Sequence, residues 1–322
     1  MNVAIVSAPP ARLLVDKLAW LTGGFTDLGH DVRRFHHFSE LQAADKWADL
    51  VLFDQYGAGL PVRNIADAAE SRTAVWAQCW RDLICTASSR AVQWQETYLG
   101  YGRVMRAMDI VFVKERHRLE EYRTARVNAV YLDCQGCTEG APRFETHDSP
   151  EFDVLVLGNA DRAYADRRAD AAALVKGGYR VLWAGLTNTA PPHGCHTHRW
   201  VHPIKELPSL ANRCAVALNV ELRYEPGYCS DRPWLLAACG IPVLVRVPGC
   251  AYEAADVPAV DIASWVYANT AELIERVGDA IASPRQRHVR GMCRRIGALA
   301  RHTYRRRAEA LLNQVETLTC RS

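Results

Sequence analysis

The chain alternates short apolar runs with stretches whose apolar residues recur at helical spacing. In residues 13–28, for example, five large apolar side chains would share one face of an amphipathic helix. Short apolar runs between polar or glycine-containing turns predict buried strands instead. In the first half of the chain we predict strands at 3–7, 31–35, 49–53, 73–80, 110–113 and 129–132, and helices at 13–28, 61–71, 91–107 and 115–125.

The same alternation restarts after residues 134–150, a polar segment rich in Gly and Pro that we interpret as a linker. Alternating strands and helices of this size predict an α/β fold with two parallel sheets, one in residues 1–150 and one in residues 151–303. In the second half we predict strands at 153–157, 179–184, 216–219, 241–245 and, at an edge, 260–262, helices at 167–176, 204–210, 234–239, 270–282 and 285–318 with a break near Thr303, and a loop at 186–199.

One strand–loop–helix unit, residues 216–245, contains the densest candidate chemistry. An apolar strand ends at Asn219, a short polar turn follows, and Pro233 is placed to begin a helix that Gly240 can end. Ligands of doubly wound sheets lie at the carboxyl ends of the strands, against helix N-termini. Ser230 and Arg232 at this turn therefore predict an anion site, although a helix cap with a surface arginine is the alternative.

A second candidate lies where the first strand of the second half ends. Gly158 and Asn159 close this strand, and glycine lets the backbone approach a ligand closely. Arg167 or Arg168, a little further on, could clamp a diphosphate with paired N–H groups. The alternative is an ordinary turn with a solvated arginine pair.

These motifs resemble those of the CgeB-type (spore-maturation) branch of the GT-B glycosyltransferases, which is related to the large family-4 group. The matching pieces are Gly227 to Arg232 (G-Y-x-S-x-R), Ala238 to Gly240 (A-C-G), His302 to Arg307 (H-T-Y-x-x-R), and Val156 to Asn159 followed by Tyr164 and Arg167-Arg168. The resemblance covers roughly residues 150–312. It implies two Rossmann-like domains that face a central cleft, with residues 304–322 forming a helix that crosses back to the first domain.

The resemblance also implies sugar transfer from a nucleoside-diphosphate sugar, UDP-sugar favoured, with retention and without a metal. Arg232 and Arg168 would then act on the departing phosphate. The remaining donor-binding candidates are Gly158, Asn159, Arg167, His202, Asn219, Tyr228, Ser230 and Asp231. Glu221 is a further polar residue that could face the donor sugar.

One position departs from the family pattern. The family has a Glu that would bind a ribose hydroxyl where this chain has Leu235. Asp231 is our first choice as its replacement and Glu225 the second. The other interpretations are a donor held differently and an inactive module of the same fold that binds a nucleotide or a partner.

The first domain should supply the acceptor side through its strand-end loops. Candidates there are Asp54, Gln55, Gln78, Arg81 and Asp82. A general base is needed only for inversion with an unactivated hydroxyl, and Asp82 and His117 are the candidates for that role.

Composition sets outer limits on this interpretation. Hydrophobic residues make up 49% and charged residues 23% of the 322 residues, as in soluble globular proteins. No apolar run approaches the roughly 18 residues of a membrane span. The first ten residues do not resemble a secretion signal, and eleven cysteines then indicate reduced thiols and a cytoplasmic location.

Two further patterns concern partners and metals. The last forty residues carry ten Arg against two Glu, which favours a solvated helix face or a nucleic-acid contact. Some phage enzymes of the GT-B fold that this chain resembles glycosylate modified DNA bases, so a phage-type DNA glycosyltransferase acting on hydroxymethylated pyrimidines is an alternative. The slightly acidic first domain, in which residues 1–150 carry 17 Lys and Arg against 19 Asp and Glu, weakens it. No Asp-x-Asp motif ends a strand. Residues 193–198 and the Cys134/Cys137 pair lack the partner pair of a zinc site, so no metal is predicted.

Overall fold

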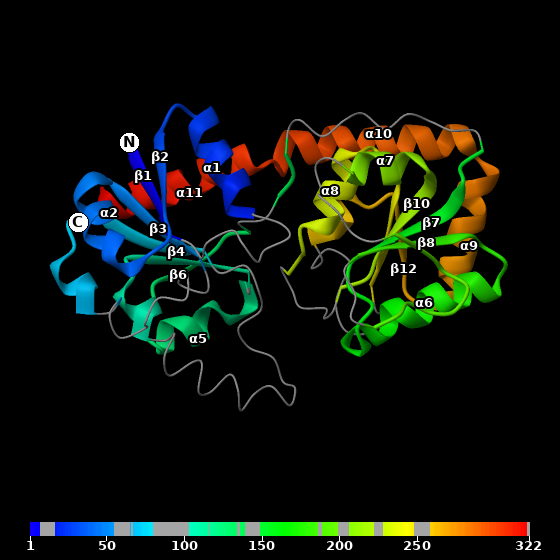
Figure 1. Cartoon of the computed structure of the whole chain (residues 1–322), viewed down its shortest axis with the longest axis horizontal. Coiled ribbons are helices and arrows are strands. Elements are labelled where there is room, and N and C mark those ends of the chain that lie inside the picture. Colours follow the sequence, from blue (N-terminus) through cyan, green and yellow to red (C-terminus); the bar gives the residue numbers. More distant parts are fainter. Residues whose placement is uncertain are drawn as a thin grey trace. The chain divides into compact units, whose positions relative to one another are not determined.

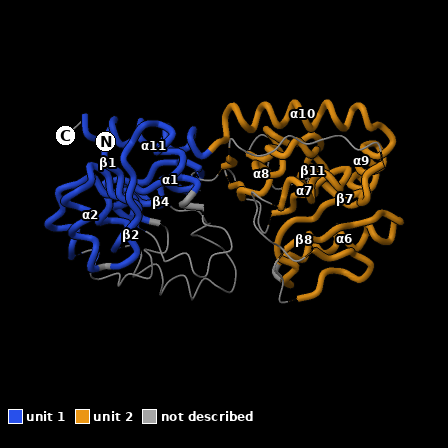
Figure 2. The backbone as a smooth tube through the Cα atoms, turned by 45° about the horizontal axis from the view of Figure 1, so that its top comes forward, with its two compact units in different colours: residues 1–135, 304–322 blue, residues 136–303 orange. Residues whose placement is uncertain are grey.

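The computed structural model describes residues 1–6, 17–54, 65, 67–79, 103–114, 116–133, 136–138, 149–185, 189–198, 206–221, 228–247 and 258–320 (Figure 1). The chain divides into two compact units, one of residues 1–135 with 304–322 and one of residues 136–303 (Figure 2). We call them unit 1 and unit 2.

Unit 1 is built on a parallel sheet of six strands. Their order across the sheet is β2-β1-β3-β4-β5-β6, and every neighbouring pair is parallel. The strands are β1 (Asn2–Val6), β2 (Asp31–Phe35), β3 (Leu50–Asp54), β4 (Val75–Cys79), β5 (Ile110–Val113) and β6 (Ala129–Tyr131). The central strands are apolar on both sides because helices cover both faces of the sheet.

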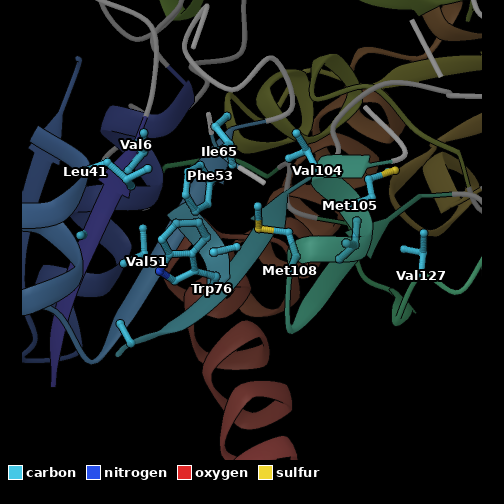
Figure 3. Close-up of a cluster of buried hydrophobic side chains, with 14 of the residues drawn as sticks. Val6, Leu41, Val51, Phe53, Ile65, Trp76, Val104, Met105, Met108 and Val127 are labelled. Carbon is cyan, nitrogen blue, oxygen red and sulfur yellow. The ribbon is translucent and has the colours of Figure 1, made fainter. Parts of the chain in front are cut away.

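The two faces of this sheet have separate cores. On one face, buried residues of α2 (Leu41–Trp47) and α5 (Leu119–Thr124) belong to the same cluster as Phe53 and Trp76, whose rings lie 5.0 Å apart (Figure 3). On the other face, α1 (Lys17–Asp27) lies beside α11 (Tyr304–Thr319), which comes from the far end of the chain. The C-terminal helix therefore completes the core of unit 1.

Unit 2 contains the second six-stranded parallel sheet, with the order β12-β11-β10-β7-β8-β9. Neighbouring strands are again all parallel. The strands are β7 (Phe152–Leu157), β8 (Val181–Ala184), β9 (His196–His198), β10 (Cys214–Asn219), β11 (Val243–Arg246) and β12 (Trp265–Tyr267). From β7, the chain first builds β8 and β9 on one side and then β10 to β12 on the other. The order of the sheet therefore reverses between β7 and β10.

Helices cover this sheet as well. On one face, α6 (Ala165–Lys176) and α9 (Thr270–Ala282) share an apolar core with the strands. The other helices are α7 (Leu207–Asn212), α8 (Arg232–Ala238) and α10 (Pro284–Arg301). Asn269 caps α9 by accepting a hydrogen bond from the Glu272 amide, and Pro284 begins α10, where its fixed backbone angle suits the first turn of a helix.

Two local predictions for the second half are wrong. The predicted edge strand at 260–262 is a 3₁₀ helix (Pro258–Ile262), and the edge strand lies just beyond it at β12. The Ala263 amide bonds back to the Val260 carbonyl, which closes the turn, and the chain joins the sheet only where the Ser264 amide meets the Val243 carbonyl. The predicted loop at 186–199 contains β9, a short polar edge strand paired with β8.

The boundary between the units falls at residues 135 and 136, earlier than the predicted boundary at 150. The Cys137 amide donates to the His302 carbonyl at 2.8 Å, and Cys137 forms a parallel bridge with Thr303. These bonds fix the start of unit 2 against the end of α10.

Among the residues that the structure describes, no helix is both long and apolar enough to cross a membrane.

Candidate active site

The candidate site lies in unit 2 at the carboxyl ends of β7 and β10. Gly158 follows β7, Glu221 follows β10, and α8 begins at Arg232. Because β7 and β10 are the neighbours between which the strand order reverses, this is the topological switch point of the sheet. Open α/β sheets bind their ligands at such a point.

Gly158 lies where any other residue would be strained and crowded. Its φ is +116°, a region that side chains rarely adopt, and a Cβ there would lie 3.0 Å from Arg232 Nη1 and 3.1 Å from Arg167 Nη1. The Gly158 carbonyl accepts a hydrogen bond from Trp183 Nε1 at 2.8 Å. A Cβ on Gly185 would lie only 2.3 Å from the same carbonyl oxygen. The close approach of two arginines to the end of β7 therefore depends on this glycine.

Glu221 is the centre of the hydrogen-bond network. Its Oε1 accepts from Asn219 Nδ2 at 3.0 Å, from Ser230 Oγ at 2.8 Å and from the Ser230 amide at 3.3 Å. Its Oε2 accepts from Arg232 Nη2 at 2.8 Å. The side chain is only 3% exposed, so these protein groups stand in place of water.

Arg232 is held by three bonds. Besides the bond to Glu221, its Nε donates to Ser230 Oγ at 3.1 Å and its Nη1 donates to the Leu157 carbonyl at 3.3 Å. These bonds use three of the five N–H groups of a guanidinium. The side chain is 17% exposed, so it is more accessible than the carboxylate to which it is bound.

Both members of this ion pair are charged. Burial alone would raise the pKa of Glu221, but the charge on Arg232 and the hydrogen bonds from Asn219 and Ser230 hold that pKa below its usual value. Burial likewise opposes the charge on Arg232, and the Glu221 carboxylate raises its pKa in spite of it. The pair is therefore a fixed carboxylate–guanidinium unit at neutral pH.

The two predicted clamp arginines are used differently. Arg167 is 1% exposed, donates to the Val220 carbonyl at 2.6 Å and to the Asn159 carbonyl at 3.0 Å, and lies 4.2 Å from the ring of Tyr164. It thus ties together the residues after β7 and β10. Arg168 donates to the carbonyls of Ala160 and Ala190, both at 2.7 Å, so it fastens two loops instead.

Other predicted residues surround this network. Asn219 is buried, and its Oδ1 has no partner among the residues that the structure describes. Tyr228 and Asp231 contribute to the field that raises the pKa of Arg232. Asp231 is the N-cap of α8 but makes no side-chain cap bond. Leu235, at the position of the family Glu, is 6% exposed on α8. The carboxylate that faces Arg232 comes from Glu221.

Some predicted residues cannot be placed in this site. Asp82 and His202 lie outside the described residues, as do Gln55, Arg81 and Glu225. His117 belongs to unit 1, where it is exposed and accepts a hydrogen bond from Arg118 Nε at 3.3 Å. Within the described ranges, no group of three or more His, Cys, Asp or Glu side chains is arranged to hold a metal ion.

Comparison with solved structures identifies the fold. Sucrose-phosphate synthase from Thermosynechococcus elongatus matches with a TM-score of 0.69 and 13% identity, over 100% of each chain. An alpha-glucosyltransferase in complex with UDP and a 13-mer DNA containing a central A:G mismatch has a TM-score of 0.69 and 11% identity, over 99% of this chain and 100% of that chain. T4 phage BGT in complex with UDP and Mn²⁺ has a TM-score of 0.65 and 11% identity, over 97% and 98%.

At these identities the likeness shows the fold alone. Two six-stranded parallel sheets with helices, matched over whole chains, make this a protein of the GT-B fold, as the sequence predicted. The chain belongs to the glycosyl transferase-like family, whose model matches residues 146–313, just over half of its length. It is therefore a glycosyltransferase of the GT-B type. No curated protein sequence matches it.

Proposed function

We propose that this glycosyltransferase moves a sugar from a nucleoside-diphosphate sugar, with UDP as the favoured nucleotide, to an acceptor hydroxyl. The donor diphosphate would lie beside Gly158, Ser230 and Arg232. We also assign the chain to the CgeB-type branch, on the motifs at 227–232, 238–240 and 302–307.

The observation that carries this proposal is the placement of Arg232. Its guanidinium lies against a glycine without a side chain, at the switch point of the sheet, and two of its N–H groups have no acceptor among the described residues. Since α8 has only seven residues, the side chains of Ser230 and Arg232, and not the helix dipole, would bind the anion.

These residues suit the chemistry of the departing group. In sugar transfer the bond between the anomeric carbon and the phosphate oxygen breaks, and negative charge grows on the nucleoside diphosphate. Donors that are already held in place stabilise such charge without reorganising during the reaction. Arg232 is held by Glu221, Ser230 and the Leu157 carbonyl, so its donors are fixed in this sense.

Titration with UDP, GDP and their sugar conjugates tests this assignment. Arg232→Ala should weaken nucleotide binding at least tenfold. Arg213→Ala is the matched control, since Arg213 pairs with Glu151 at the opposite end of β10. Failure of the wild type to bind any nucleotide, or equal binding by wild type and Arg232→Ala, would show that the assignment is wrong.

Retention and metal independence form a separate part of the proposal. Arg232 and Arg167 supply positive charge beside the proposed diphosphate position. In metal-dependent enzymes a divalent ion provides this positive charge. Donor turnover should therefore persist in EDTA, and NMR of the product should show the anomeric configuration of the donor. Loss of turnover in EDTA with recovery on adding Mn²⁺ or Mg²⁺ would contradict metal independence.

A DNA acceptor is the second candidate, and one feature of the structure favours it. Helix α10 contains six Arg and no Asp or Glu, and Arg285, Arg290 and Arg301 on it are exposed. An alpha-glucosyltransferase of the same fold has been solved with UDP and DNA. Binding to duplex DNA that weakens steeply with added salt, with transfer to hydroxymethylated pyrimidines, would support this acceptor, and the absence of such binding would rule it out.

A further inference from the structure

We propose that Glu221 is a counter-charge that competes with the diphosphate for Arg232 and thereby limits how tightly the spent nucleotide is held. This inference rests on the proposed function, because it concerns the same anion site. It gives Glu221 a role in nucleotide release and not only in folding.

The first step is geometric. Glu221, Ser230 and Arg232 form a closed ring, in which Ser230 Oγ donates to Glu221 at 2.8 Å and accepts from Arg232 Nε at 3.1 Å. Arg232 Nη2 completes the ring at the other carboxylate oxygen, at 2.8 Å. The guanidinium is thus oriented by the carboxylate, directly and through the serine.

The second step concerns charge. Arg167 and Arg232 bring two positive charges to the end of β7, and Glu221 cancels one of them. The carboxylate is 3% exposed, so water screens it poorly. A diphosphate placed on Arg232 would also lie near this fixed negative charge. Glu221 therefore lowers the affinity of the site for an anion while it holds the arginine in position.

The third step concerns which partner requires the charge of Glu221. Asn219 and Ser230 do not require it, since the oxygen of a neutral amide could accept the same hydrogen bonds. Arg232 does, because its guanidinium is largely buried beside the other carboxylate oxygen and would otherwise be an uncompensated charge. The charge of Glu221 is therefore directed at Arg232, the group that a bound diphosphate would also contact.

Glu221→Gln tests this inference by removing the charge while keeping the size of the side chain and the oxygen that accepts from Asn219 and Ser230. With UDP as the probe, we expect calorimetry to show about tenfold tighter binding than in the wild type, from the loss of one poorly screened negative charge. Glu221→Ala, the second variant, should also bind UDP more tightly, provided that its melting curve shows a folded protein. Glu221→Asp should stay within about twofold of the wild type, because the charge is retained.

A double-mutant cycle shows whether the effect acts through Arg232. In the Arg232→Ala background, Glu221→Ala should tighten UDP binding much less than it does when Arg232 is present. Glu151→Gln is the control for a paired carboxylate elsewhere in unit 2, and it should leave UDP binding unchanged. If folded Glu221→Gln and Glu221→Ala bind UDP equally to the wild type or more weakly, the inference is wrong. If the wild type binds neither UDP nor GDP, the proposed function itself fails.

Discussion

Gly158 is the residue on which the geometry of the site depends most. An added methyl group would meet the terminal nitrogens of Arg167 and Arg232, and the φ of +116° would be strained as well. Neither arginine can retreat easily, because Arg167 is fully buried and Arg232 is bound to Glu221. A substitution here should therefore damage binding in addition to stability.

Gly158→Ala should weaken UDP binding at least tenfold and lower the free energy of unfolding. Gly178→Ala is the matched control, since Gly178 also has a positive φ, +87°, but a Cβ there meets nothing within 4 Å. The control should cost only about 1–2 kcal/mol of stability for the backbone strain and leave UDP binding intact. Equal UDP binding by both variants would contradict the role given to Gly158.

Gln78 in unit 1 is a buried polar residue near the end of a strand. It lies near the carboxyl end of β4 and is 0% exposed, and neither atom of its amide has a partner within the described structure. A buried amide without partners costs roughly 1–3 kcal/mol per unpaired group. A residue that binds a ligand can have this cost in the free protein. The amide of Gln78 could both donate a hydrogen bond to an acceptor hydroxyl and accept one from it, which agrees with its predicted role.

Gln78→Met should therefore raise the free energy of unfolding by at least about 1 kcal/mol, because it removes the unpaired amide and keeps a similar shape. Chemical denaturation measures this change, and UDP binding should stay the same. Gln42→Met on the exposed side of α2 is the control and should have little effect on stability. A destabilised Gln78→Met protein would show that the amide has partners in the folded state.

The candidate site was only partly predictable from its residues. Gly158, Ser230 and Arg232 stand out in the sequence because each lies between the end of a strand and the first turn of a helix. Glu221 was named only as a residue that could face the donor sugar, although it is the centre of the network. Its partners lie up to eleven positions away, and only the reversal of strand order between β7 and β10 brings them together with Gly158.

At the scale of elements, one carboxylate joins α2 to β4 in unit 1. Asp45 is 8% exposed and accepts hydrogen bonds from the amides of Thr73 and Ala74, from the Thr73 hydroxyl and from Trp76 Nε1. Burial opposes its charge, but these hydrogen bonds together hold the pKa of Asp45 below its usual value. Its contribution to stability is therefore complete above the pKa of the unfolded chain and is lost as the pH falls through the lower, folded-state pKa.

Asp45→Asn should destabilise unit 1 by about 2 kcal/mol at pH 7, because the new amide group must face one of these donors. It should also reduce the loss of stability below about pH 4, where the unfolded wild-type chain takes up a proton at Asp45 before the folded protein does. Denaturation at several pH values measures both effects. Asp67→Asn, an exposed carboxylate paired with Arg103, is the control. Parallel pH profiles for wild type and Asp45→Asn would contradict this account.

Most elements were predictable because strands that are buried on both faces of a parallel sheet have apolar sequences. Five of the six strands of each sheet are apolar runs of this kind. Strand β5 has the bounds that we predicted, and β6 is the shortest strand of unit 1. The errors concern the edges of unit 2, where β9 has the sequence His-Thr-His and is stabilised by pairing with β8. A strand with one neighbour and no apolar run has no signal of its own in the sequence.

At the scale of the whole molecule, the C-terminal helix belongs to the core of unit 1. Leu311, Leu312 and Val315 of α11 are buried with Leu21 and Phe25 of α1. The backbones of the two helices approach so closely that a Cβ on Gly24 would lie 2.5 Å from the Tyr304 carbonyl oxygen. Unit 1 therefore cannot complete its core until the last part of the chain is present.

Leu311→Ala should lower the stability of unit 1 by about 3 kcal/mol, the usual cost of truncating a fully buried leucine. UDP binding, which we assign to unit 2, should not change at temperatures where the protein is folded. Glu316→Ala, at an exposed position of the same helix, provides the control. An unchanged unfolding transition in Leu311→Ala would show that α11 does not contribute to this core.

The account as a whole depends on the anion site at the switch point of unit 2. Its most direct test is calorimetric titration of UDP and GDP into wild type, Arg232→Ala and Arg213→Ala, each shown to be folded by its melting curve. We predict that wild type and Arg213→Ala bind at least one of the two nucleotides with similar affinity and that Arg232→Ala binds it at least tenfold more weakly. Equal affinities in all three proteins, or no binding of either nucleotide by the wild type, would contradict the account.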